Sequence, residues 1–125
     1  MPSKVLILED EEDILFLFRD YLAMKGYQIV CCCVGLDGIM ENFEQSGPDI
    51  CIIDYLLRNS ENGIDAAIKI LDKNRMMPIL FITGYESFID ELPKYPILQD
   101  KNIHVLLKPV HLPRIDDTIL SMITR

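Results

Sequence analysis

The chain has 125 residues, half of them hydrophobic, with a formal net charge of −8 and four cysteines. This length and apolar content predict a single domain, residues 1–125, with its own hydrophobic core. The acidic balance excludes duplex nucleic acid and anionic lipid as expected partners, because both need clustered lysine and arginine.

The first part of the chain predicts a strand, a helix and a second strand. An apolar run at residues 5–8 ends on an acidic stretch at residues 9–13, and apolar residues then recur at helical spacing over residues 14–22. Gly26 is expected to end this helix as a C′ glycine. Residues 28–34 predict the second strand.

The middle of the chain predicts a helix, a buried strand and another helix. A helical pattern at residues 36–43 is broken by a Gly-Pro pair, and the apolar run at residues 50–53 then ends on Asp54. Because all four residues of this run are apolar, we expect a strand that is buried on both faces, as in parallel sheets covered by helices. A polar loop at residues 58–62 leads into a helical pattern at residues 64–71.

The last part predicts two more strands and a final helix. The fourth strand, residues 79–82, ends on Thr83. Two prolines interrupt the following segment, so the fourth helix is expected to be short or irregular. Residues 103–107 predict the fifth strand, which ends on Lys108, and residues 112–123 carry the apolar face of the last helix.

Five strands alternating with about five helices predict βαβ units, and therefore a doubly wound α/β fold with a parallel sheet. The crossovers are expected to be right-handed. The periodicity leaves the order of the strands open. In such sheets, ligands bind beyond the carboxyl ends of the strands, so the residues that follow each strand are the candidates for a site.

Polar residues follow four of the five strands, and they are expected to meet at one edge of the sheet. Three carboxylates there would repel one another unless a cation joined them. Mg²⁺ suits this need, since it binds one or two carboxylates together with waters and phosphate oxygens. An ammonium and a hydroxyl are the groups expected around a transferring phosphoryl group. The candidate residues are Glu9, Asp10, Asp54, Thr83 and Lys108.

Taken singly, each of these residues has a simpler structural explanation. Asp54 could cap a turn, Thr83 could form a side-chain turn, and Lys108 could be a solvated loop lysine. Their arrival together at one sheet edge is what favours a site, with Asp54 as the reacting residue and Asp10 and Asp54 as direct metal ligands. Glu9 is expected to hold a metal-bound water.

The sequence lacks the patterns of a membrane-spanning segment, a signal peptide or a cysteine zinc site. The apolar runs are shorter than the roughly 20 residues that span a bilayer, and the N-terminus lacks the pattern of a signal peptide, so we expect a cytoplasmic location. Residues 31–33 are contiguous cysteines and Cys51 lies in the buried run, an arrangement unlike a paired zinc motif. We expect reduced cysteines that pack in the interior.

Four spaced motifs, LILEDEE, ICIIDYLL, ILFITG and LLKPV, carry a family resemblance. From about Lys4 to its end, the chain resembles the receiver domain of two-component response regulators. The resemblance implies a flavodoxin-like fold with strand order 2-1-3-4-5. It also implies that Asp54 accepts a phosphoryl group from a sensor histidine kinase or a histidine phosphotransfer protein, and that a downstream protein or effector domain reads the switch.

The same resemblance assigns roles to the other residues. Glu9, Asp10, Asp54 and the backbone carbonyl of Leu56 would bind Mg²⁺, with Thr83 as the switch hydroxyl and Lys108 as the phosphate-pairing lysine. The Lys108-Pro109 peptide bond is expected to be cis. The acyl phosphate stores a signal, so the chain is expected to be a self-phosphorylating and self-dephosphorylating switch rather than a turnover enzyme.

One departure from the family pattern, and one pair of residues beside the site, affect the expected mechanism. Val105 stands where many receivers carry an inward-swinging tyrosine or phenylalanine, so the usual switch and output face are not assumed here. Leu56 and Tyr85 flank the path of water to the acyl phosphate, and both are bulky and largely apolar. We therefore expect slower self-dephosphorylation than in a Leu56→Asn, Tyr85→Glu variant.

Three other classes of protein share features of this sequence. A pseudo-receiver would be a binding module with this fold that is never phosphorylated, and Val105 leaves room for it. An aspartate-nucleophile phosphatase is disfavoured because Leu56 stands where that family has a second aspartate. A flavodoxin is disfavoured because the first turn is acidic instead of rich in hydroxyls and glycines.

Overall fold

The structure is a computed structural model that describes residues 3–57 and 61–124. Residues 1–2, 58–60 and 125, which include part of the predicted polar loop at 58–62, lie outside the described residues. The strands are β1 (Lys4–Leu8), β2 (Gln28–Cys33), β3 (Ile50–Ile53), β4 (Ile79–Thr83) and β5 (Ile103–Leu107). The helices are α1 (Glu12–Met24), α2 (Ile39–Ser46), α3 (Gly63–Lys73), α4 (Phe88–Glu91), the 3₁₀ helices η2 (Leu92–Lys94) and η3 (Pro96–Leu98), and α5 (Leu112–Ile123).

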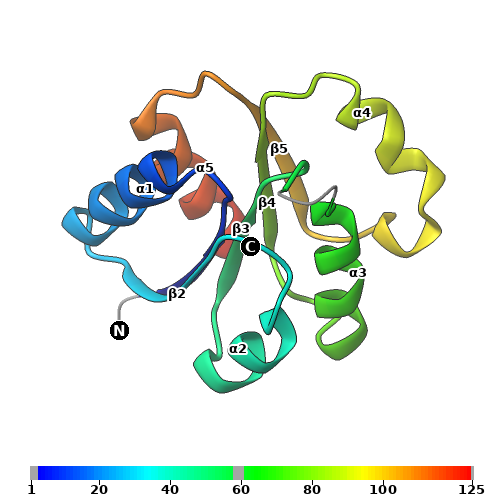
Figure 1. Cartoon of the computed structure of the whole chain (residues 1–125), viewed down its shortest axis with the longest axis horizontal. Helices are drawn as coiled ribbons and strands as arrows, with labels where there is room; N and C mark the ends of the chain where they lie inside the picture. Colours follow the sequence, from blue (N-terminus) through cyan, green and yellow to red (C-terminus); the bar gives the residue numbers. More distant parts are fainter. Residues whose placement is uncertain (1–2, 58–60, 125) are drawn as a thin grey trace.

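All five strands are parallel and lie in the order β2-β1-β3-β4-β5. This confirms the predicted α/β fold and the flavodoxin-like order 2-1-3-4-5. Figure 1 shows the central sheet with α1 and α5 on one side and α2 and α3 on the other. The order of the strands brings the carboxyl ends of β1, β3 and β4 next to one another at one edge.

The sheet divides the apolar core into two layers because side chains alternate along each strand. Leu6 and Leu8 of β1 face the layer formed with α2 and α3, while Val5 and Ile7 face the layer formed with α1 and α5. All four residues of β3 are buried, as their apolar run predicts. The strand that leads to Asp54 is therefore held from both faces.

Helix limits differ from the apolar patterns by a few residues. Helix α1 begins at Glu12, two residues before its first apolar position, because acidic residues suit the positive end of a helix dipole. Gly26, with a φ of 98°, follows the helix at the C′ position as expected. Helix α4 is a single turn followed by η2 and η3, which begin around Pro93 and Pro96, so the fourth helix is short as predicted.

Two other expectations concern the cysteines and the membrane. All four cysteines are free, and Cys33 and Cys51 are buried, but Cys32 is exposed on β2 and does not pack in the core. Across residues 3–57 and 61–124, no helix combines the length and apolar character needed to cross a membrane.

Candidate functional site

The backbone of the sheet fixes the residues that follow the strands. Glu9 donates its amide to Cys33 at 2.9 Å, and Asp54 donates its amide to Leu8 at 2.9 Å, so both hydrogen bonds continue the pairing one residue beyond the strands. The amide of Lys108 likewise donates to the carbonyl of Thr83 at 2.8 Å. The loops at this edge therefore begin from rigidly held positions.

Lys108 joins two of the predicted carboxylates. Its Nζ donates to Glu9 Oε1 at 2.7 Å and to Asp54 Oδ2 at 3.3 Å. Glu9 is 2% exposed and Asp54 is also buried, so these charge-assisted contacts are shielded from water. Residues that directly follow β1, β3 and β5, and that are far apart in sequence, thus meet at one point.

Burial governs the charge of this cluster. Burial raises the pKa of Glu9 to about 7, the hydrogen bond from Lys108 opposes that rise, and the charge of Asp54 adds to it. For Lys108, burial lowers the pKa, but the hydrogen bond to Glu9 and the charge of Asp54 outweigh it and raise the pKa above its ordinary value. Lys108 therefore remains a fixed cation between two carboxyl groups.

The donor atoms present fit a hard divalent cation. One carboxylate oxygen from each of Glu9, Asp10 and Asp54 lies within 4.8 Å of the other two. Carboxylate oxygens are the kind of ligand that Mg²⁺ prefers. In this cluster Glu9 Oε1 accepts a hydrogen bond from Lys108, and Glu9 Oε2 accepts one from the Glu11 amide at 3.2 Å.

An open hollow of about 340 Å³ contains most of the predicted groups. Leu56 and Tyr85, the two residues predicted to shield the site from water, also line it and are 45% and 48% exposed. A larger hollow of about 820 Å³ lies around Asp49, Pro78 and Asn102, at the opposite edge of the sheet. The smaller hollow is lined by Asp10, Glu11, Asp54, Leu56, Leu57, Thr83, Gly84, Tyr85 and Lys108.

The loop after β3 is shaped by a glycine. Gly63 opens α3, and its amide donates to the carbonyl of Tyr55 at 2.6 Å. A Cβ at this position would overlap the backbone oxygen of Asp54 and lie 2.8 Å from Ile53 Cγ2. Asn62 caps the helix by accepting the Ile64 amide at 2.6 Å. Only glycine lets the helix start this close to the candidate phosphoacceptor.

The structure also shows the surroundings of the predicted switch residues and of the Lys108-Pro109 bond. Thr83 is buried at the end of β4, and its Oγ1 accepts the backbone amide of Tyr85 at 3.1 Å. Val105 is half-buried on β5 and pairs with Phe81 in the sheet. The peptide bond between Lys108 and Pro109 is cis, as the resemblance implied.

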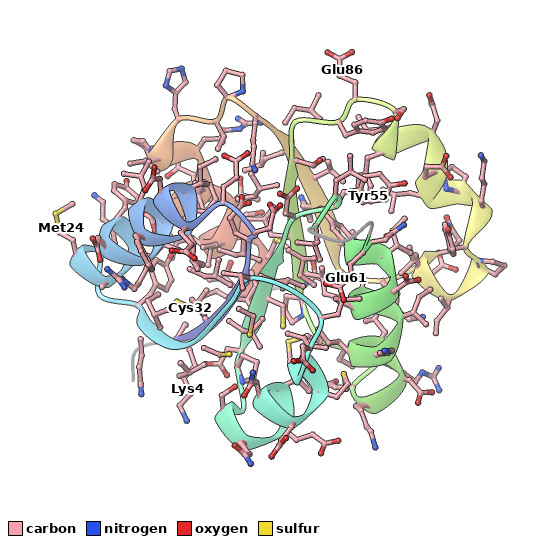
Figure 2. All side chains as sticks on the ribbon, viewed as in Figure 1. Lys4, Met24, Cys32, Tyr55, Glu61 and Glu86 are labelled. Carbon is pink, nitrogen blue, oxygen red and sulfur yellow. The ribbon has the colours of Figure 1, made fainter. Side chains whose placement is uncertain are left out.

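Sequence reasoning missed two features close to the site. Glu61 Oε1 accepts the Leu36 amide at 3.1 Å and so ties the β3–α3 loop to the β2–α2 loop. Tyr55, directly after Asp54, lies on the side of the sheet that α3 covers (Figure 2). Its ring packs at a tilt against the rings of Tyr85 and Phe88. An aromatic residue directly after the candidate acceptor was the only signal in the sequence for this packing. The rings that it contacts belong to a segment about 30 residues further along the chain, which the sequence pattern does not place beside it.

Comparisons with known proteins agree with this architecture. The family model for the response regulator receiver domain matches residues 5–120. The polar-differentiation response regulator DivK of Brucella anthropi is 29% identical over 123 residues, covering 97% of this chain and 96% of DivK. The alkaline phosphatase synthesis transcriptional regulatory protein PhoP of Bacillus subtilis is 27% identical over 92 residues, which cover 74% of this chain and 38% of PhoP.

A solved structure gives the same fold. The receiver domain of the response regulator PhyR from Erythrobacter litoralis matches with a TM-score of 0.83 at 24% identity. The match covers 98% of this chain and 91% of that domain. At this level of identity the likeness concerns the fold.

Proposed function

This chain belongs to the response regulator receiver domain family, and we propose that it is a phosphoryl-accepting switch with Asp54 as the acceptor. The observation that best supports this is the position of Lys108, whose ammonium lies 2.7 Å from Glu9 and 3.3 Å from Asp54. Thr83 lines the same hollow. The group therefore offers a nucleophile, a fixed cation and a hydroxyl in one place.

In the proposed reaction, a carboxylate oxygen of Asp54 attacks the phosphorus of a phosphohistidine. The new P–O bond forms as the P–N bond breaks, and the imidazole leaves with the electron pair and takes up a proton. The donor is a sensor histidine kinase or a histidine phosphotransfer protein. Lys108 and Thr83 stabilise the phosphoryl oxygens as their charge is redistributed.

Glu9, Asp10, Asp54 and the backbone carbonyl of Leu56 are the groups proposed to hold Mg²⁺. Bound there, the ion would neutralise negative charge on the transferring group. Receiver domains are signalling switches, and we propose that the acyl phosphate on Asp54 is read by a downstream protein or effector domain. The proposal includes one domain over residues 1–125 and the cytoplasmic location expected from the sequence.

Intact mass spectrometry after incubation with acetyl phosphate tests this function. The expected result is one phosphoryl adduct on the wild type, present with Mg²⁺, absent after chelation with EDTA, and absent from Asp54→Asn. Asp49→Asn is the matched control, since Asp49 lies at the opposite edge of the sheet and should leave the adduct intact. An adduct on Asp54→Asn, or none on the wild type, would contradict the assignment.

The alternative is a pseudo-receiver that binds a partner without being phosphorylated. The feature that leaves room for it is Val105, which stands where many receivers carry an aromatic switch residue. In that case the wild type gains no adduct, and Mg²⁺ has no effect on its thermal stability.

A further inference from the structure

Four aromatic rings form a continuous cluster beside the site. The cluster consists of Tyr55, Phe81, Tyr85 and Phe88. The ring of Tyr55 lies 5.8 Å from that of Tyr85 and 4.7 Å from that of Phe88, measured between centroids. Phe88 in turn lies 4.7 Å from Phe81. These tilted arrangements are in the range where aromatic pairs attract one another.

The aromatic cluster is attached to the site at two points. Tyr55 directly follows Asp54 in the chain. Tyr85 donates its backbone amide to Thr83 Oγ1 at 3.1 Å. The hydroxyl proposed to contact the phosphoryl group is therefore hydrogen-bonded to a member of the cluster before phosphorylation. Any rotation of the Thr83 side chain either carries this amide along or releases it.

The backbone of Thr83 cannot take up that movement. Its carbonyl accepts the Lys108 amide at 2.8 Å, and the residue pairs with Leu107 in the sheet. The adjustment must therefore occur in the segment that follows, Gly84 and Tyr85. Tyr85 is half-exposed, so its ring has room to move against Tyr55.

The other end of the cluster reaches helix α4. Phe88 is fully buried, while the next residue, Ile89, is 50% exposed. Ile89 lines a hollow of about 410 Å³ together with Val105 and Leu107. Ile89 directly follows Phe88 in this single-turn helix, so a displacement of the Phe88 backbone would also move Ile89 and change the shape of this hollow.

Val105 is poorly suited to carry the same signal. It is a short, β-branched side chain on a paired strand, and β-branching restricts rotation about its χ1 angle. Its neighbour across the sheet, Phe81, belongs to the aromatic cluster. The rings on the α3 and α4 side of the sheet are thus the continuous packed connection between the site and α4 in this part of the structure.

We propose that Tyr55 and Tyr85 are positioning residues that hold the Thr83 hydroxyl on the Tyr85 amide, and that they transmit its reorientation through Phe88 to α4. The inference rests on the proposed phosphorylation of Asp54. The tilted contact between the rings of Tyr55 and Tyr85 keeps the Thr83–Tyr85 hydrogen bond in place before phosphorylation. After phosphorylation, a new position of Tyr85 repacks Tyr55 and Phe88.

Fluorine NMR of protein labelled with 3-fluorotyrosine tests the first step. The chain has five tyrosines, and single Tyr→Phe variants assign their resonances. On phosphorylation with acetyl phosphate and Mg²⁺, we expect the Tyr55 and Tyr85 resonances to shift. Tyr21 and Tyr27 pack against the opposite layer of the core, so their resonances should stay in place.

Hydrogen exchange of the α4 segment, residues 88–91, tests the second step. Samples are compared at equal phosphorylated fraction, measured by intact mass. The change in exchange that phosphorylation produces in the wild type should be kept in Tyr85→Phe, which retains a ring, and lost in Tyr85→Leu. Tyr21→Leu, on the opposite face, is the matched control and should retain the change.

Two results would overturn the inference while leaving the proposed function intact. One is a phosphorylated protein whose Tyr55 and Tyr85 resonances do not move. The other is a Tyr85→Leu variant whose α4 segment responds as the wild type does. A wild type that gains no phosphoryl adduct would instead overturn the proposed function, and the inference with it.

Discussion

Replacing Gly63 with alanine is expected to destabilise the fold next to Asp54. The added Cβ would overlap the Asp54 carbonyl oxygen and lie 2.8 Å from Ile53 Cγ2. Neither atom can easily withdraw, because one belongs to the backbone and the other lies in the buried strand β3. The start of α3 must therefore move, which also weakens the 2.6 Å hydrogen bond from Gly63 to Tyr55.

The magnitude follows from three contributions to the free energy of unfolding. Overpacking of a tight site costs about 1–3 kcal/mol. Weakening one backbone hydrogen bond costs about 1 kcal/mol. The higher helix propensity of alanine offsets at most about 1 kcal/mol of this loss in the free energy of unfolding. The expected net loss for Gly63→Ala is about 1–3 kcal/mol, or a few degrees in Tm for each kcal/mol.

Urea denaturation followed by far-UV circular dichroism measures this loss. Gly84→Ala is the matched control, because a Cβ there would meet only Lys108 Cβ, at an ordinary 3.8 Å. We expect Gly84→Ala to remain within about 0.5 kcal/mol of the wild type. If Gly63→Ala were as stable as Gly84→Ala, the close approach of α3 to Asp54 would be wrong.

Three further predictions concern other contacts. Tyr27→Phe should lower the free energy of unfolding by about 0.5–1.5 kcal/mol, because it removes the 2.7 Å hydrogen bond to Asp116, and chemical denaturation measures it. The double variant Leu56→Asn, Tyr85→Glu should lose its phosphoryl group faster than the wild type in a mass-spectrometric decay assay; equal decay rates would contradict the shielding role. Lys108→Ala should accept phosphoryl from acetyl phosphate about 10²–10³-fold more slowly, since it loses a fixed cation, and an unchanged rate would remove Lys108 from the mechanism.

The sequence pattern was sufficient to predict the strands and helices because its strongest signals are local. The run Ile50 to Ile53 is apolar throughout, and that pattern alone predicts a strand covered on both faces, which the structure confirms. The strand order came from the family resemblance, since periodicity along one chain does not say which strands are neighbours. The interrupted fourth helix was predictable because proline removes a backbone donor at fixed positions.

What the sequence could not give are distances between residues far apart in the chain. The edge of the sheet was predictable, but the contact between Lys108 and Glu9, at a separation of 99 residues, depends on side-chain conformations and burial. The stacking of Tyr55 with Phe88 depends in the same way on how an irregular segment folds back over β3. Hydrophobic patterns carry no information of this kind.

The site thus combines a rigid part with a part that has room to move. Asp54 and Lys108 are held by backbone hydrogen bonds to neighbouring strands, so their geometry is set by the same bonds that define the sheet. Tyr85 lies beyond the last paired residue of β4 and is half-exposed. Substitutions in the rigid part should therefore alter phosphoryl transfer and stability together. Substitutions at Tyr85 should change the response of the loop to phosphorylation without lowering stability, because the sheet remains intact.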